Sequence, residues 1–89
     1  MAYSVEVSES ADRELGKLEP QHRGRILRFL NQRVAKLDDP RSLGEALHGS
    51  LLGEFWKYCV GDYRLICKIE DTRLLVLVLR IGHRKEIYR

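Results

Sequence analysis

Residues 54–70 read E-F-W-K-Y-C-V-G-D-Y-R-L-I-C-K-I-E, and they give the clearest structural signal in the sequence. Apolar and polar side chains alternate on both sides of the dipeptide Gly61-Asp62, which favours a two-residue β-turn. The pattern therefore predicts an antiparallel hairpin of two strands, 54–60 and 63–70. Its register pairs these residues: Val60 with Tyr63, Cys59 with Arg64, and Lys57 with Ile66.

The same alternation assigns the side chains of the hairpin to two faces of the sheet. One face is apolar and aromatic, and we expect helices to cover it: Trp56, Tyr58, Val60, Tyr63, Leu65, Cys67 and Ile69. The other face carries the cations, and we expect it to stay open: Phe55, Lys57, Cys59, Arg64, Ile66 and Lys68. Because Cys59 and Cys67 fall on opposite faces, this register excludes a disulfide between them, and we interpret both as small packing residues.

A third strand is predicted after the hairpin, following a second tight turn at Asp71-Thr72. Residues 73–81 are apolar at nearly every position, which is typical of a central strand that is covered on both faces. They lead into the basic sequence R-I-G-H-R-K-E-I-Y-R at 80–89. This end of the chain is either a solvated tail or one wall of a site on the open face of the hairpin.

The N-terminal half predicts one further strand and two helices. Residues 3–7 alternate as a strand does, and Ser8 or Ser10 is suited to cap the helix that follows. Pro20 then begins a second helix, 20–37, whose apolar stripe is flanked by basic residues. That basic face is either solvated or meets an anionic partner.

The loop at residues 41–53 connects the helices to the hairpin, and Glu45 and His48 are its candidates for acid–base chemistry. Together the elements predict one α+β domain, residues 1–89. A mostly antiparallel four-stranded sheet carries an N-terminal helical hairpin on one face, in the order strand-helix-helix-strand-strand-strand. A chain of 89 residues is long enough for one sheet with one layer of helices.

The composition is that of a basic globular protein. The 44% of hydrophobic residues excludes a disordered chain, and the net charge of +3 favours an anionic partner. No apolar run approaches the roughly 20 residues that cross a bilayer, and there is no signal core, so we expect a cytoplasmic protein. The cysteine and histidine spacings match no metal site, and we expect neither a metal nor a cofactor.

The open face and the basic tail together contain the groups that metal-free attack on a phosphodiester requires: Lys57, Arg64, His83, Arg84 and Tyr88. Arginine holds two phosphate oxygens at once and stabilises the added charge of the transition state, and lysine adds a point charge. Histidine transfers protons near neutral pH, and tyrosine orients a base or assists the transfer. If the substrate is RNA, its own 2′-OH serves as the nucleophile. The structural alternative is that Arg64 pairs with Asp62 or Glu54.

Two motifs resemble a known family. G-D-Y-R-L-I at 61–66 and R-I-G-H-R-K-E-I-Y at 80–88 are similar to the RelE toxins of bacterial toxin–antitoxin systems, and the order of elements agrees over essentially the whole chain. The resemblance implies a compact α+β fold and metal-independent, ribosome-dependent cleavage of mRNA in the A site of the 70S ribosome. It also implies neutralisation by an acidic, helical, RelB-like antitoxin whose chain wraps the toxin.

The resemblance extends to single residues of the two motifs. Arg64 takes the place of the family's transition-state arginine, and Arg84 matches its second catalytic arginine. Tyr88 matches the C-terminal tyrosine that stacks on the base or assists proton transfer. Further RNA contacts are expected from the cations on the open face and in the tail: Lys68, Arg80, Lys85 and Arg89.

The acid and base are less clearly matched to the family. Lys57 corresponds to one of two lysines in the strand before the turn, whereas Phe55 stands at the position of the other. His83 precedes Arg84 and is a candidate general acid. The sequence G-E-A-L-H at 44–48 is similar to a loop of the YoeB branch, which makes Glu45 an alternative candidate as the base.

Two other functions share features with this sequence. A ParE-like toxin has the same fold but inhibits DNA gyrase by binding, without cutting RNA, and such chains generally lack the combined Arg, Arg and Tyr set. A non-catalytic adaptor that binds an acidic helical partner would also account for the basic charge.

Overall fold

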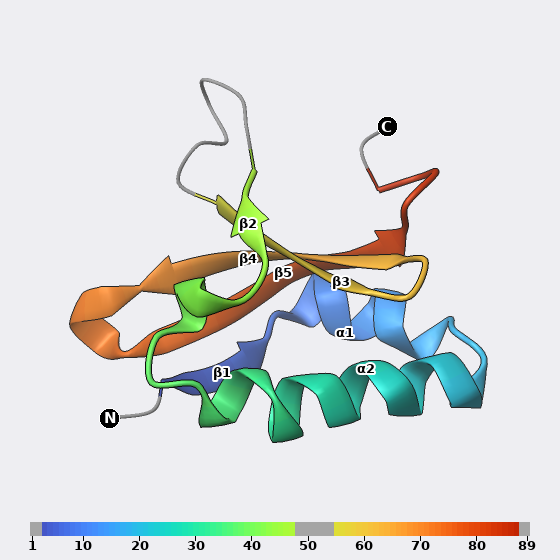
Figure 1. Ribbon diagram of the computed structural model, residues 1–89. Coiled ribbons are helices and arrows are strands. Elements are labelled where there is room, and N and C mark those ends of the chain that lie inside the picture. Colours follow the sequence, from blue (N-terminus) through green and yellow to red (C-terminus); the bar gives the residue numbers. More distant parts are fainter. Residues whose placement is uncertain (1–2, 48–54, 88–89) are drawn as a thin grey trace.

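The computed structural model describes residues 3–47 and 55–87, and it shows two helices on one side of a five-stranded sheet (Figure 1). No helix in this part of the chain is both long and apolar enough to span a membrane. Short 3₁₀ turns lie at Val34–Lys36, Pro40–Ser42 and Asp71–Arg73. The helices and strands are β1 (Ser4–Val7), α1 (Glu9–Gly16), α2 (Pro20–Gln32), β2 (Glu45–Ala46), β3 (Phe55–Val60), β4 (Tyr63–Glu70) and β5 (Leu75–His83).

The strands lie in the order β1-β5-β4-β3-β2. β1 pairs with β5 in parallel, and the other neighbours are antiparallel. The predicted fold class, a mostly antiparallel sheet with a helical hairpin on one face, is therefore confirmed. The sheet has five strands instead of four because Glu45 and Ala46 pair with Lys57 and Trp56. A strand of two residues is too short to show an alternation in the sequence.

The central hairpin has the predicted register. Its six pairs extend from Phe55 opposite Lys68 to Val60 opposite Tyr63. Gly61 has a φ of 58°, in the left-handed region that glycine adopts without strain, and the residue that follows does not have a positive φ. A positive φ at only the first central position is the type II′ pattern, whose twist matches that of the flanking strands.

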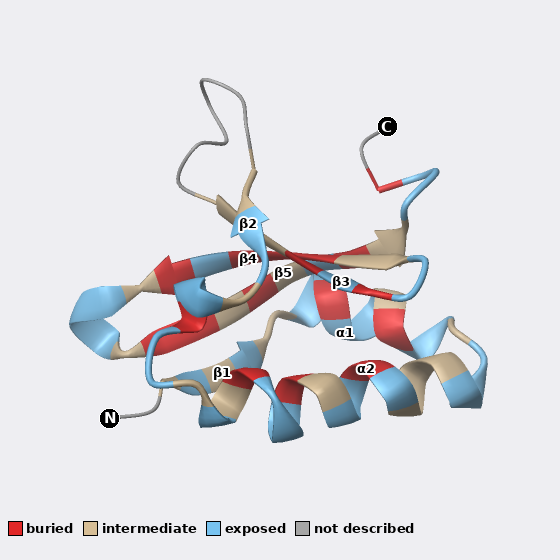
Figure 2. Cartoon of the chain, viewed as in Figure 1, coloured by how far each residue is buried: buried red, intermediate tan, exposed pale blue. Residues whose placement is uncertain are grey.

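The helix-covered face of the hairpin forms the core together with α1, α2 and β5 (Figure 2). Most of the side chains assigned to this face are buried: Tyr58, Val60, Leu65, Cys67 and Ile69. On the opposite face Cys59 and Lys68 are exposed as expected, but Ile66 is buried. Ile66 lies between Lys57 and Arg80 across the sheet, and the long aliphatic parts of such side chains cover apolar neighbours.

A β-bulge interrupts the pairing of β4 with β5. Ile66 lies opposite Arg80, but the next pair contains Val78, so Leu79 is an extra residue in β5. Val78 and Ile81 are both buried in the core, whereas strict alternation from Val78 would have directed Arg80 into it. The sequence pattern did not predict this shift.

The connection between β4 and β5 differs from the two-residue turn predicted at Asp71-Thr72. Residues 71–73 form a 3₁₀ turn, and Leu74 follows with a φ of 48°. The Asp71 carboxylate accepts hydrogen bonds from the Tyr3 hydroxyl at 2.7 Å and from Arg41 at 2.8 Å. These donors hold the pKa of Asp71 below its usual range. Because the turn extends to Leu74, β5 begins at Leu75 and ends at His83, which is two residues later than predicted at each end.

Both helices begin where the sequence indicated. The Ser8 hydroxyl caps α1 by accepting a hydrogen bond from the backbone N–H of Ala11 at 3.1 Å. Pro20 occupies the first turn of α2, where its missing N–H costs nothing. α2 ends at Gln32, earlier than the predicted residue 37, and the chain continues in the 3₁₀ turn Val34–Lys36.

Replacing Tyr58 with phenylalanine should lower the free energy of unfolding by about 1–3 kcal/mol. The buried Tyr58 hydroxyl donates to the Pro40 carbonyl at 2.6 Å, and the substitution leaves that acceptor unpaired inside the core. Tyr63→Phe is the matched control, because the Tyr63 hydroxyl bonds to no other described residue, and it should change stability by less than about 0.5 kcal/mol. Urea denaturation measures both values, and equal losses would contradict the assignment.

Stability should fall as the pH rises above about 8.5, where an unfolded cysteine begins to ionise. Burial raises the pKa of the Cys67 thiol to about 12, so the folded chain keeps a proton that the unfolded chain releases. The stabilisation is thus complete below the unfolded pKa and is lost at higher pH, by up to about 1.4 kcal/mol per pH unit. Urea midpoints between pH 7 and 9, below the range in which unfolded tyrosines ionise, should show this slope in Cys59→Ala, whose thiol is exposed, and lose it in Cys67→Ala. A slope that persists in Cys67→Ala would exclude this cause.

Candidate functional site

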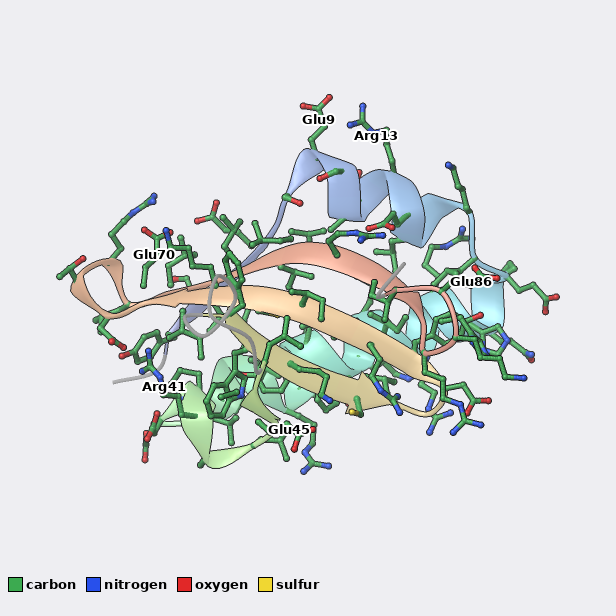
Figure 3. The ribbon with its side chains drawn as sticks, turned by 90° about the horizontal axis from the view of Figure 1, so that it is seen from above. Glu9, Arg13, Arg41, Glu45, Glu70 and Glu86 are labelled. Carbon is green, nitrogen blue, oxygen red and sulfur yellow. The ribbon has the colours of Figure 1, made fainter. Side chains whose placement is uncertain are left out.

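Two rows of side chains lie next to each other on the sheet face that the helices leave uncovered, which we call the open face. Figure 3 looks down on it, with Glu45 labelled. The strand registers place these residues in the longer row, from β2 across to β5: Glu45, Lys57, Ile66 and Arg80. The neighbouring row, nearer the Gly61-Asp62 turn, contains these residues: Cys59, Arg64 and Gly82.

Glu45 and Lys57 form an ion pair at one end of the longer row. Nζ of Lys57 lies 2.7 Å from Oε1 of Glu45, and the Lys57 side chain is only 20% exposed. The contact follows from the pairing of β2 with β3, because residues directly opposite each other in an antiparallel ladder have adjacent side chains. The structure therefore brings together a predicted phosphate contact and a predicted candidate base.

Arg64 lies in the shorter row, and its guanidinium turns back toward the hairpin turn. Nη1 donates to the carbonyls of Gly61 at 3.0 Å and Tyr63 at 3.1 Å. Among residues 3–47 and 55–87, no carboxylate forms an ion pair with Arg64, so the suggested pairing with Asp62 is not observed, and Glu54 lies outside these ranges. Carbonyl oxygens orient the guanidinium but leave its positive charge available for an anion.

Arg84 reaches the same turn from the C-terminal side. Its backbone N–H donates to the Asp62 carbonyl at 2.8 Å, and its Nε lies 3.6 Å from Asp62 Oδ1. The Arg84 side chain is 53% exposed, so this ion pair is open to solvent. The two arginines predicted to act together, Arg64 and Arg84, thus both contact the Gly61-Asp62 turn.

His83 lies on the other face of the sheet. It pairs with Tyr63 across the strands, and the two rings meet edge to face with centroids 5.8 Å apart. On this side His83 helps to line a cavity of about 270 Å³ that also involves His22 and Arg25. Its Nδ1 accepts a hydrogen bond from the N–H of Lys85 at 3.1 Å. The structure therefore does not bring His83 to the face that carries Arg64.

The remaining predicted site residues have different environments. Lys68 and Lys85 are exposed, and Lys68 is on the open face. Arg80 is engaged by Glu14 of α1, with Nη2 lying 3.2 Å from Oε2. Three candidates lie outside the described residues: His48, Tyr88 and Arg89.

Two residues near the site were not singled out by the sequence. Arg25 of α2 covers the turn so closely that a Cβ added to Gly61 would lie 2.8 Å from its Nη1. Glu14 of α1 accepts hydrogen bonds from Arg80 and from the N–H of Ile81. Arg25 belongs to the basic face predicted for the second helix, but its contact with the turn, like the contacts of Glu14, joins distant elements and leaves no local pattern. In the ranges that the structure covers, no three His, Cys, Asp or Glu side chains are grouped so that they could hold a metal ion.

The chain matches known toxins over nearly its whole length. Residues 5–88 match the family described as ParE toxin of type II toxin-antitoxin system, parDE. Toxin RelG of Mycobacterium tuberculosis is 34% identical over 89 residues, which span 100% of this chain and 99% of that protein.

Solved structures show the same fold. In the toxin–antitoxin complex RelBE2 of Mycobacterium tuberculosis, a chain that is 28% identical matches with a TM-score of 0.84, covering 97% of this chain and 95% of that chain. The isolated E. coli RelE toxin matches with a TM-score of 0.71 at 24% identity, covering 98% and 92%. The resemblance to RelE toxins is thereby confirmed. This protein belongs to the RelE/ParE superfamily of toxins from type II toxin–antitoxin systems.

Proposed function

We propose that this toxin is a ribosome-dependent mRNA endoribonuclease that works without a metal ion and uses the RNA 2′-OH as its nucleophile. The proposal is carried by the convergence of Arg64 and Arg84 on the Gly61-Asp62 turn. Two guanidinium groups on one small turn suit a phosphate whose charge increases during reaction. The Glu45–Lys57 pair on the same face adds groups able to handle protons.

The reaction is a transesterification within the RNA backbone, in which phosphorus exchanges its bond to the 5′ oxygen for a bond to the 2′ oxygen. A base removes the proton of the 2′-OH, and the 2′ oxygen attacks the adjacent phosphorus. The bond from phosphorus to the 5′ oxygen then breaks, and an acid donates a proton to that leaving oxygen. The products are a 2′,3′-cyclic phosphate and a 5′-OH. Arg64 and Arg84 bind the non-bridging oxygens, which carry the most charge in the transition state.

The acid and base roles are best assigned to residues of the open face. A carboxylate such as Glu45 accepts a proton, and the adjacent Lys57 ammonium stabilises the negative charge that develops nearby. The position of His83 against Tyr63, on the opposite face, argues against it as the acid. Tyr88 keeps the role that the family resemblance implies, which is stacking on a base or assisting proton transfer.

The partners follow from the same site. Exposed cations such as Lys68 and Lys85, together with Arg89 in the sequence, are suited to RNA phosphates. The open face offers few groups with which to position a flexible mRNA, so the A site of the 70S ribosome supplies that positioning. An acidic, helical, RelB-like antitoxin is the expected inhibitor. In support, the similar chain from Mycobacterium tuberculosis is part of a toxin–antitoxin complex, RelBE2.

A second candidate is inhibition of DNA gyrase by binding, because residues 5–88 match the ParE toxin family. The two candidates make different demands on the site. Cleavage requires Arg64 and Arg84 individually, whereas a binding toxin needs a surface and tolerates the loss of one cation with a modest decrease in affinity.

Primer extension on translated mRNA after induction should show cuts within codons for the wild-type toxin. Arg64→Ala and Arg84→Ala should each reduce the cleavage rate by about 10²–10³-fold, which is typical for the loss of one group that stabilises transition-state charge. Arg13→Ala is the matched control, because this arginine is exposed on α1 and paired with Glu9, and it should cut at the wild-type rate.

Two results would contradict the proposal. Intact mRNA combined with gyrase-linked DNA breaks would assign the protein to the gyrase inhibitors. Full toxicity of both arginine variants would show that the Arg64–Arg84 site is not the one that acts.

A further inference from the structure

β5 extends beyond the end of β1, and side chains take over the hydrogen bonding along its exposed edge. β1 ends at Val7, and the hydroxyl of Ser8 then donates to the Leu79 carbonyl at 3.3 Å. Further along, the backbone N–H of Ile81 donates to Oε1 of Glu14 at 3.0 Å. The Glu14 carboxylate thus accepts the hydrogen bond that a neighbouring strand would accept, because β1 ends before this point.

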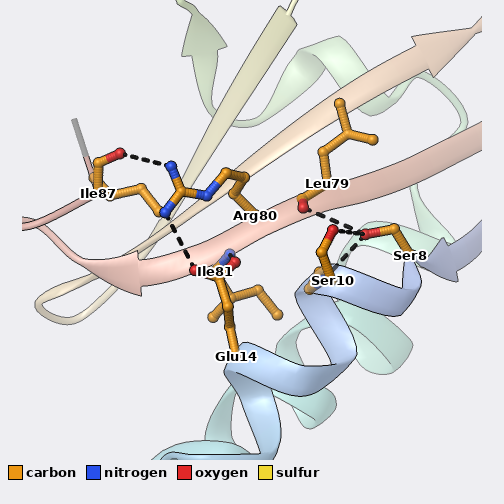
Figure 4. A network of polar contacts seen from close by, with 8 residues as sticks. Ser8, Ser10, Glu14, Leu79, Arg80, Ile81 and Ile87 are labelled. Carbon is orange, nitrogen blue, oxygen red and sulfur yellow. Dashed lines mark hydrogen bonds and ion pairs between the residues drawn. The ribbon is translucent and has the colours of Figure 1, made fainter. Parts of the chain in front are cut away.

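The same carboxylate connects this edge to the C-terminal segment through Arg80 (Figure 4). Oε2 of Glu14 accepts from Nη2 of Arg80 at 3.2 Å, and Nη1 of Arg80 donates to the Ile87 carbonyl at 3.3 Å. The Glu14 side chain is 29% exposed and that of Arg80 is 48% exposed, so the pair is partly shielded from water. Two side chains therefore link α1, β5 and the C-terminal segment in one chain of hydrogen bonds.

The segment that receives the Arg80 hydrogen bond is packed against the open face. Ile87 is 4% exposed, and its N–H donates to the His83 carbonyl at 2.9 Å. It lies so close to Gly82 that a Cβ there would be 2.9 Å from Ile87 Cδ1. Residues 84–87 therefore have a defined place, and Arg84 begins this segment.

We infer that Glu14 and Arg80 are positioning residues that hold residues 84–87 in place, and with them Arg84 at the hairpin turn beside Arg64. The inference rests on the proposed function. It reassigns Arg80, which the sequence predicted as an RNA contact, because its guanidinium is already bonded to Glu14 and Ile87. A displacement of Arg84 by about 1 Å would slow a reaction that depends on alignment by up to about a hundredfold.

The variant Glu14→Gln tests this role on programmed ribosomes. Glutamine keeps the shape and one oxygen for the Ile81 N–H, but it forms no ion pair with Arg80. We expect kcat to fall about tenfold or more, with KM changed by less than about twofold, because alignment is lost and RNA binding is not. If Arg80 were an RNA contact, removing its carboxylate partner would lower KM and leave kcat unchanged, and that result would overturn the inference.

The chain provides a matched control on the same helix. Glu9 of α1 also pairs with an arginine, Arg13, at 3.6 Å, but both side chains project away from the sheet (Figure 3). Glu9→Gln should therefore keep the wild-type kcat and KM. A loss in Glu9→Gln equal to that in Glu14→Gln would attribute the effect to the charge of α1 and would overturn the inference.

Amide hydrogen exchange of the free toxin tests the same contact without RNA. In an Arg64→Ala background, Glu14→Gln should speed exchange of the Arg84 and Ile87 amides about tenfold, while Val76, which lies near the start of β5 between β1 and β4, keeps its rate. Arg80→Gln leaves the hydrogen bond from Ile81 to Glu14 in place and should give the same pattern. Unchanged exchange in both variants would overturn the inference.

The two measurements separate this inference from the proposed function. A wild-type toxin that cuts no RNA would defeat the proposed function, and faster exchange at Arg84 and Ile87 would still support the positioning contact. A wild-type toxin that cuts RNA, with neither kcat nor exchange altered by Glu14→Gln, would defeat the positioning role alone.

Discussion

A β-bulge inserts Leu79 into β5, and the arrangement of the open face depends on this one extra residue. Before the bulge the even-numbered residues of β5 face the helices, and after it the odd-numbered residues do. Arg80 and Gly82 consequently lie on the open face, and His83 lies on the other. Without the bulge Arg80 would be directed into an apolar core, where an unpaired charge is strongly destabilising. The bulge beside the candidate site therefore re-aims side chains while the rest of the sheet keeps its pairing.

The charges of the open face are arranged around this geometry. Three cations on the open face or at the adjoining turn have a carboxylate partner: Lys57 with Glu45, Arg80 with Glu14, and Arg84 with Asp62. Arg64 instead bonds to backbone carbonyls, and within the described residues no carboxylate neutralises it. The Arg84–Asp62 pair is open to solvent, so it contributes at most about 1 kcal/mol and exchanges readily for another anion. The Lys57–Glu45 and Arg80–Glu14 pairs each contain one side chain that is less than a third exposed, and both reduce the repulsion between the cations.

Much of the fold was predictable because its signals are local. The turn at Gly61-Asp62 and the alternation beside it predicted every pair of the central hairpin, and Ser8 and Pro20 predicted the starts of both helices. The short strand Glu45–Ala46 was not predictable, because it exists only through its pairing with β3. The 3₁₀ turn at 71–73 depends likewise on partners far away in the sequence.

The candidate site shows the same division. That Lys57 and Arg64 share one face, and that a basic segment follows the last strand, was predictable from the residues alone, because period-two alternation and chain order are sufficient for both conclusions. The position of His83 on the other face and the contact of Glu14 with Arg80 became visible only in the folded chain. A bulge and a helix-to-strand contact are set by pairing and packing between distant segments, which leave no periodic pattern in the residues that take part.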